Sequence, residues 1–159
     1  QDARAPLALR LPDTTFDERL TVYGETRTVE LLTFGGGHTD SDAVLWLPEE
    51  RILFAADLLF HGSHPWIGDG HPDEWVRILG DLEALEPETV VPGHGPLATV
   101  AAFDEQRRYF PVLRAAAEQV MAAGGSAKDA ALPDAFSHLE GADGFNRNLG
   151  VMIDWLAGS

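Results

Sequence analysis

The feature that most constrains this chain is an arrangement that occurs three times: an apolar, strand-like run ends, and a residue able to bind a metal follows it. The three runs, each with the residue that follows it, are 29–34 with His38, 52–56 with Asp57, and 89–91 with His94. Strands fix the positions of side chains at their ends, while the adjoining loops leave those side chains accessible. We therefore interpret His38, Asp57 and His94 together as one candidate site.

Histidine and aspartate are ligands that suit zinc, iron and manganese. Glycines accompany both histidines, with three directly before His38 and one on each side of His94. Because glycine has no Cβ, it lets the backbone approach a neighbouring group closely. The pattern predicts a site for a divalent metal, with zinc as the first choice and iron or manganese as alternatives.

The chain resembles the metallo-β-lactamase-fold hydrolases over roughly residues 20–100. The resemblance rests on the last three metal-ligand motifs of that family, which occur here in the same order as Gly-Gly-Gly-His-Thr-Asp-Ser-Asp, Leu-Phe-Ala-Ala-Asp-Leu-Leu-Phe and Val-Pro-Gly-His-Gly. It implies that His38 binds one metal, that Asp57 bridges two metals and that His94 binds the second. It also implies a catalytic role for Asp57, because bridged metals lower the pKa of a bound water.

The same resemblance implies an α/β fold that is a portion of the αββα sandwich of this family, a mixed sheet with flanking helices. We expect a single domain over 1–159, with a sheet-rich part carrying the ligand motifs (1–98) and a helical tail (99–159). The β-rich runs and their turns predict hairpins over 20–34 and 42–56. Helices are predicted from Pro72 to Pro87 and over 100–123, 127–132 and 143–157, and a short strand over 7–11.

The leading motif of the resembled family, H-x-H-x-D-H, is absent from this sequence, which begins at Gln1 rather than Met. We therefore expect the C-terminal portion of a hydrolase that uses one or two metal ions to cleave an ester, thioester, lactam or similar bond of a small molecule. The alternative is a non-catalytic, oligomerising module with a weak or absent metal site. Because half a sandwich exposes an apolar face, we expect a homodimer or association with the missing N-terminal half.

Polar residues near the three candidates extend the candidate site. Thr39 and Asp42 follow His38, where they either support the ligand or satisfy backbone groups of the turn. His61, His64 and His71 lie in a loop rich in glycine and proline, directly after the strand that carries Asp57. These three histidines are candidates for extra ligands or substrate contacts, with ordinary loop positions as the alternative.

Charge and composition exclude several classes of function. The formal net charge is −15, from 26 acidic and 11 basic residues, so binding to nucleic acids or to anionic membrane surfaces is disfavoured. No cysteine is present, which excludes disulfides, thiol nucleophiles and cysteine-based zinc sites and leaves the cellular compartment open. No apolar run approaches the roughly 20 residues that a membrane-spanning helix needs.

Overall fold

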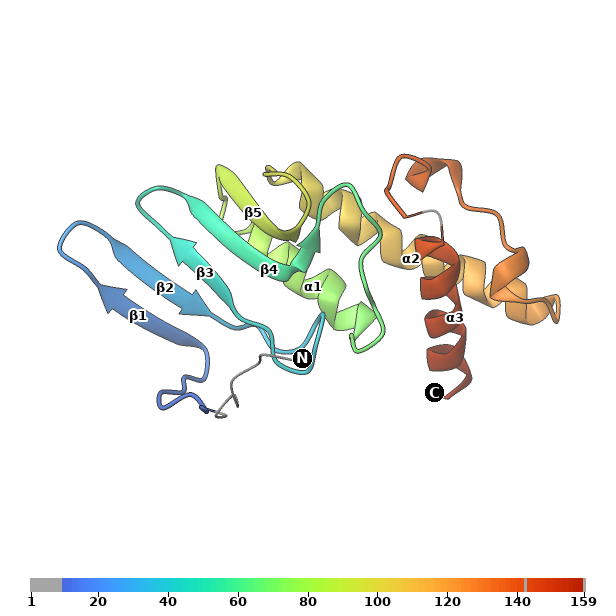
Figure 1. Ribbon diagram of the computed structural model, residues 1–159, viewed down its shortest axis with the longest axis horizontal. Helices are drawn as coiled ribbons and strands as arrows, with labels where there is room; N and C mark the ends of the chain where they lie inside the picture. Colours follow the sequence, from blue (N-terminus) through green and yellow to red (C-terminus); the bar gives the residue numbers. More distant parts are fainter. Residues whose placement is uncertain (1–9, 142, 159) are drawn as a thin grey trace, which may run out of the picture.

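The computed structural model describes residues 10–141 and 143–158. It shows a mixed five-stranded sheet in the order β1-β2-β3-β4-β5, with β5 parallel to β4 and the other pairs antiparallel (Figure 1). The strands are β1 (Arg19–Tyr23), β2 (Thr28–Leu32), β3 (Val44–Leu47), β4 (Ile52–Phe60) and β5 (Thr89–His94). The predicted mixed sheet with flanking helices is confirmed. Of the strand predicted over 7–11, residues 7–9 lie outside the described residues, and Arg10 and Leu11 do not belong to a strand.

Both predicted hairpins are present, and their turns explain the register of the strands. In the first hairpin Tyr23 pairs with Thr28, and the Gly24 N–H donates to the carbonyl of Arg27 at 3.0 Å. In the second, Leu47 pairs with Ile52, and the intervening Arg51 has a φ of 53°. A positive φ is uncommon for a residue with a side chain. Arg51 adopts it where the chain turns into the second strand of the hairpin.

The helices are α1 (Pro72–Glu83), α2 (Ala101–Ala122) and α3 (Gly144–Ala157), with 3-10 turns η1 (Ala127–Asp129) and η2 (Asp134–Phe136). The helix predicted over 127–132 is therefore too long. Pro133 disfavours helical geometry at the residue before it, and Ala130 is already extended, with a ψ of 134°. Among the described residues, no helix is both long and apolar enough to cross a membrane.

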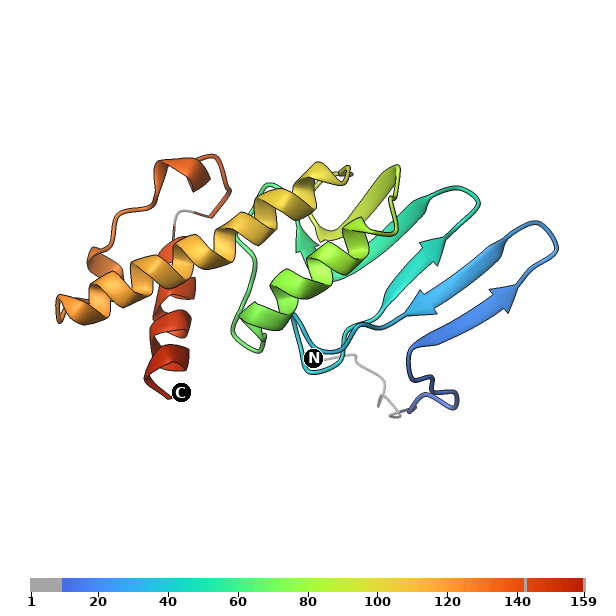
Figure 2. The same cartoon turned by 180° about the vertical axis from the view of Figure 1, so that it is seen from behind.

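The core lies between one face of the sheet and the helices α1 and α2, which Figure 2 shows in front of the strands. Side chains alternate along β4, so Leu53 and Ala55 are buried toward the helices while Phe54 is exposed on the other face. Helix α1 contributes an apolar stripe in which every side chain is fully buried: Trp75, Ile78, Leu79 and Leu82. Burial of each such side chain contributes about 1.5–3 kcal/mol to the stability.

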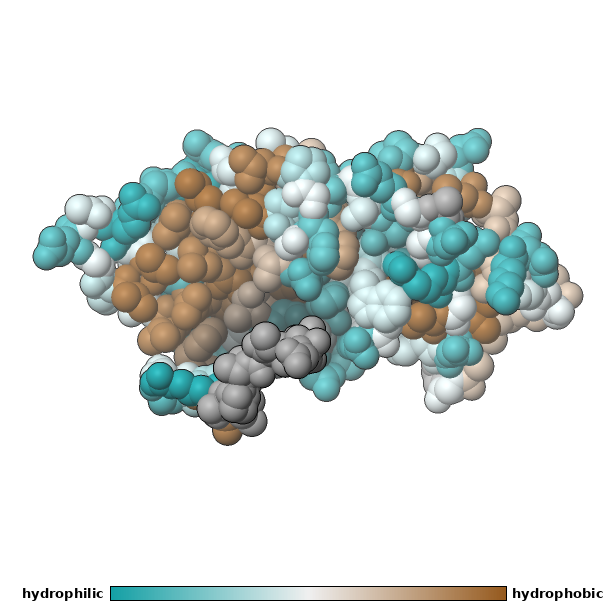
Figure 3. Space-filling view, in the orientation of Figure 1, coloured by the Kyte–Doolittle hydropathy of each residue, from teal (hydrophilic) through white to brown (hydrophobic). Residues whose placement is uncertain are grey.

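The other face of the sheet is strongly apolar, and no helix among residues 10–141 and 143–158 lies on it. One residue from each strand forms a row of register partners across it: Leu20, Leu31, Leu45, Phe54 and Val91. Figure 3 shows hydrophobic residues gathered over the strands on this side of the molecule. We name this row the open apolar face. Apolar patches of this extent on a soluble protein mark interaction sites.

We expect the chain to form a homodimer in solution with two open apolar faces packed against each other. Phe54→Asp would place a charge in that interface and should yield monomers, as measured by light scattering coupled to size-exclusion chromatography. Met121→Asp is the matched control, because Met121 has the same 41% exposure as Phe54 but lies near the end of α2. A monodisperse monomer of the unmodified chain, or equal dissociation by both substitutions, would contradict this expectation.

Candidate functional site

The parallel pairing of β4 with β5 brings two of the three predicted ligands together. Asp57 lies in β4, His94 ends β5, and the Asp57 Oδ1 and His94 Nε2 atoms are 3.5 Å apart. Both side chains are accessible, with 47% and 55% of their surface exposed. A carboxylate and an imidazole therefore converge where an external ion or substrate could reach them.

An irregularity in the β4–β5 ladder explains why Asp57 meets His94. Ala56 has a φ of 48° and pairs with Pro92, and the register shifts on both sides of this pair. Because proline has no N–H, the ladder cannot continue regularly through Pro92. At Gly93 a Cβ would lie 2.1 Å from Asp57 Oδ1 and 2.7 Å from the Ala56 carbonyl oxygen. Only glycine lets the two strands approach closely enough for the pair to form.

The loop that follows His94 is held by His61. The His61 N–H donates to the carbonyl of His94 at 2.9 Å, and its Nδ1 lies 3.1 Å from the carbonyl oxygen of Pro96. A Cβ at Gly95 would lie 1.8 Å from the His61 carbonyl oxygen, and Gly95 has a φ of 98°. His61 thus uses one ring nitrogen to order the loop around His94.

His38 lies in the loop between β2 and β3, packed among aromatic rings. Its ring centroid is 5.4 Å from that of Trp75 and 5.9 Å from that of Phe60. Phe60 also stacks on His94, with centroids 4.5 Å apart and planes 13° from parallel. The two histidines therefore share one aromatic neighbour.

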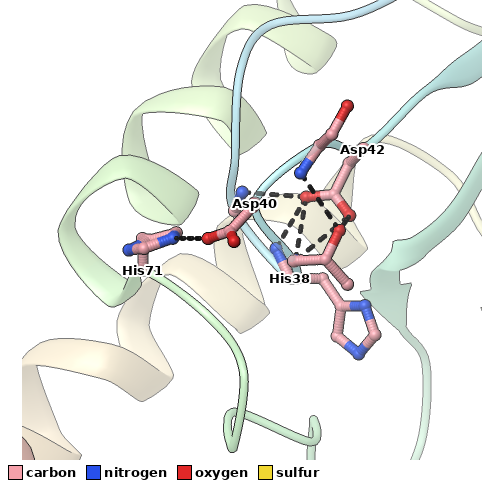
Figure 4. A network of polar contacts seen from close by, with 7 residues as sticks. His38, Asp40, Asp42 and His71 are labelled. Atoms are coloured by element: carbon pink, nitrogen blue, oxygen red, sulfur yellow. Dashed lines mark hydrogen bonds and ion pairs between the residues drawn. The ribbon is translucent and has the colours of Figure 1, made fainter.

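Asp42 orders the loop that carries His38. One carboxylate oxygen accepts hydrogen bonds from the N–H groups of Gly37 and His38, each at 2.8 Å. The other accepts the Thr39 hydroxyl at 2.7 Å, and the Thr39 N–H lies 3.2 Å from both oxygens. In Figure 4 the His38 ring points away from this network. Asp42 and Thr39 thus satisfy the backbone N–H groups of the turn. By holding the backbone of the turn, they position His38.

The remaining loop histidines lie in separate places. The Nε2 atom of the exposed His71 lies 2.8 Å from the Asp40 Oδ1 atom (Figure 4). The backbone N–H of His71 donates to the carbonyl of Gly37. His64 is buried against α2, with its Nδ1 3.1 Å from the Tyr109 hydroxyl. Burial lowers the pKa of His64 and raises the pKa of Tyr109 to about 12. Both groups are therefore neutral at pH 7.

The sequence reasoning did not identify Phe60, Trp75 and Gln106 as neighbours of the candidate site. Gln106 offered a signal, because it falls within the apolar stripe of α2 formed by Ala102, Phe103, Tyr109, Phe110 and Leu113. An amide in a buried stripe needs hydrogen-bond partners. The position of Gln106 in this stripe therefore indicated that its side-chain amide has hydrogen-bond partners.

The donor atoms of Asp57 and His94 suit zinc, but a catalytic zinc site uses three protein ligands. Within residues 10–141 and 143–158, no group of three or more histidine, cysteine, aspartate or glutamate side chains is arranged to hold a metal. His38 does not join the other two predicted ligands in such a group. The described residues therefore provide a converging pair rather than a complete metal site.

Comparisons with known proteins place the chain in a family. Residues 1–94 match the family described as the metallo-beta-lactamase superfamily. Over 92 residues, 55% of this chain and 37% of the relative, the chain is 35% identical to the metallo-beta-lactamase type 2 of Bacteroides fragilis. It is 31% identical over 81 residues to a beta-lactamase-like protein 2 homolog of Caenorhabditis elegans, covering 51% of this chain and 26% of that protein.

A solved structure shows the same similarity. The metallo-beta-lactamase from Pontibacter korlensis superposes with a TM-score of 0.58 and 26% identity, over 63% of this chain and 49% of that one. The chain therefore spans about half of the solved structure and about a third or less of the two curated relatives.

Removal of the Asp42 carboxylate tests its role in the His38 loop. Asp42→Ala leaves several backbone N–H groups without their acceptor, so we expect a loss of about 2–4 kcal/mol in the free energy of unfolding, measured by urea denaturation. Asp40→Ala is the control, because the exposed Asp40 contacts His71 outside this network. Equal stability of the two variants would show that Asp42 does not hold the loop.

Proposed function

Because this chain belongs to the metallo-beta-lactamase superfamily, we propose that it is part of a metal-dependent hydrolase in which Asp57 and His94 bind a divalent metal, zinc in the first place. The substrate would be a small molecule with an ester, thioester, lactam or similar bond. The observation that supports this proposal best is the 3.5 Å approach of two accessible side chains, that of Asp57 within β4 and that of His94 at the end of β5.

The chain's own residues would have distinct tasks in such a site. Asp57 and His94 would supply two ligands, and the remaining ligands would come from His38 or from polypeptide outside this chain. Phe60 supports the His94 ring by stacking on it, and Asp42 orders the backbone of His38. In sites of this kind, the metal supplies a water molecule that is acidic enough to ionise near neutral pH.

A second candidate function is a non-catalytic module that associates through its open apolar face. The number of converging ligands favours it, because among the three predicted ligands only Asp57 and His94 lie within ion-pair distance of each other, and the described residues hold no group of three ligands. In this case the pair would bind metal weakly or not at all. Metal binding by the purified chain separates the two candidates.

We expect the chain to bind about one zinc ion, measured by equilibrium dialysis with elemental analysis. Asp57→Ala and His94→Ala each remove one donor of a two-donor pair and should each weaken binding by tenfold or more, since even groups that only orient a ligand change metal affinity about 10–100-fold. His138→Ala is the control, because that exposed histidine contacts Glu105 away from the pair.

Zinc binding that survives both substitutions would place the metal elsewhere, and no binding by the unmodified chain would favour the non-catalytic module. A chain that binds zinc should then be assayed with a simple ester, a thioester and a lactam in parallel. Hydrolysis that depends on zinc and is lost in the Asp57→Ala variant would establish the reaction class.

A further inference from the structure

From Asp57 to its end at Phe60, β4 does not pair regularly with β5. Ala56 pairs with Pro92 and Phe60 pairs with His94, with a register shift between these pairs. The backbone groups between Asp57 and Phe60 therefore need partners other than those of a regular parallel ladder. Two side chains from the helices behind the sheet provide partners for the Leu58 carbonyl and the Phe60 N–H.

Gln106 of α2 contacts the backbone on both sides of Leu59. Its Oε1 accepts a hydrogen bond from the Phe60 N–H at 2.8 Å, and its Nε2 donates to the Leu58 carbonyl at 2.9 Å. The side-chain amide thus makes the two contacts that a neighbouring strand would make. Gln106 is 4% exposed, so water cannot readily replace these hydrogen bonds.

Trp75 of α1 supports the same point on the strand. Its Nε1–H donates to the Leu58 carbonyl at 2.9 Å, and its side chain is fully buried. Leu58 directly follows Asp57, and the Phe60 ring stacks on His94. The residues that the two helices hold are therefore the immediate neighbours of the Asp57–His94 pair.

We propose that Gln106 is a positioning residue that, together with Trp75, fixes the end of β4 and thereby the placement of Asp57 and Phe60 against His94. Its importance for metal binding rests on the function proposed above, whereas its effect on the geometry of the strand end does not. The two parts can therefore be tested separately.

The test uses Gln106→Met, which keeps the length of the side chain and removes both hydrogen bonds. The first readout is hydrogen exchange of the Phe60 amide by NMR, which should accelerate at least tenfold relative to amides in the β3–β4 ladder. The second is the chemical shift of the His94 ring protons, which the stacked Phe60 ring displaces. This displacement of the chemical shift should be smaller in Gln106→Met and in Trp75→Phe. Phe60→Leu removes the stacked ring and therefore gives the reference value for complete loss of the displacement.

Two control variants separate positioning from general stability. Gln119→Met makes the same substitution at an exposed position of α2, and Leu149→Ala removes a fully buried side chain of α3, which packs on α2. Both should leave the His94 ring protons unchanged, and neither should accelerate exchange of the Phe60 amide relative to amides in the β3–β4 ladder. If Gln106→Met loses stability as Leu149→Ala does but leaves both signals unchanged, Gln106 only fills space in the core and the proposal is wrong.

Zinc affinity completes the comparison. If the unmodified chain binds zinc at Asp57 and His94, Gln106→Met should weaken binding at least fivefold and Gln119→Met should not. If the unmodified chain binds no zinc, the proposed function fails while the exchange and chemical-shift measurements still decide whether Gln106 positions the strand end. Unchanged zinc affinity in Gln106→Met, together with a shifted His94 signal, would overturn its role in metal binding.

Discussion

The parallel pairing of β4 with β5 is the constraint on which the rest of the structure depends. Parallel neighbours end at the same edge of a sheet, and they require a crossover connection, which α1 provides here. The crossover buries its apolar stripe against the sheet, so core packing and the meeting of Asp57 with His94 have a common origin. Pro92 and Gly93 then break the regular ladder where the aspartate must approach the histidine.

The two faces of the sheet have different surroundings, and this difference links the candidate site to the question of partners. Helices α1 and α2 lie over one face near β4 and β5 and contact the last residues of β4 through Trp75 and Gln106, while the opposite face is apolar and, within the part of the chain that the structure describes, carries no helix (Figures 1 and 2). Helix α3 packs against His64, whose ring leaves no room for a Cβ at Gly144, the first residue of that helix.

Local patterns predicted the hairpins, the helices around Trp75 and Tyr109, and the two residues that converge, because periodicity and strand ends depend on near neighbours in the sequence. The tertiary contacts were less accessible. The buried position of His64 and the two hydrogen bonds of Gln106 depend on residues more than 40 positions away, and no local pattern encodes such a partner. The position of the His38 ring likewise depends on its contacts with the Phe60 and Trp75 rings. His38 does not complete a group of three metal ligands among the described residues.

The proposed metal-binding pair of this chain is Asp57 and His94. Crystals equilibrated with zinc, with diffraction recorded on both sides of the zinc absorption edge, locate a bound ion without reference to activity. We expect an anomalous peak within coordination distance of both Asp57 Oδ1 and His94 Nε2, about 2.0–2.2 Å from each. A peak at other residues, or none at zinc concentrations that saturate binding in solution, would contradict it.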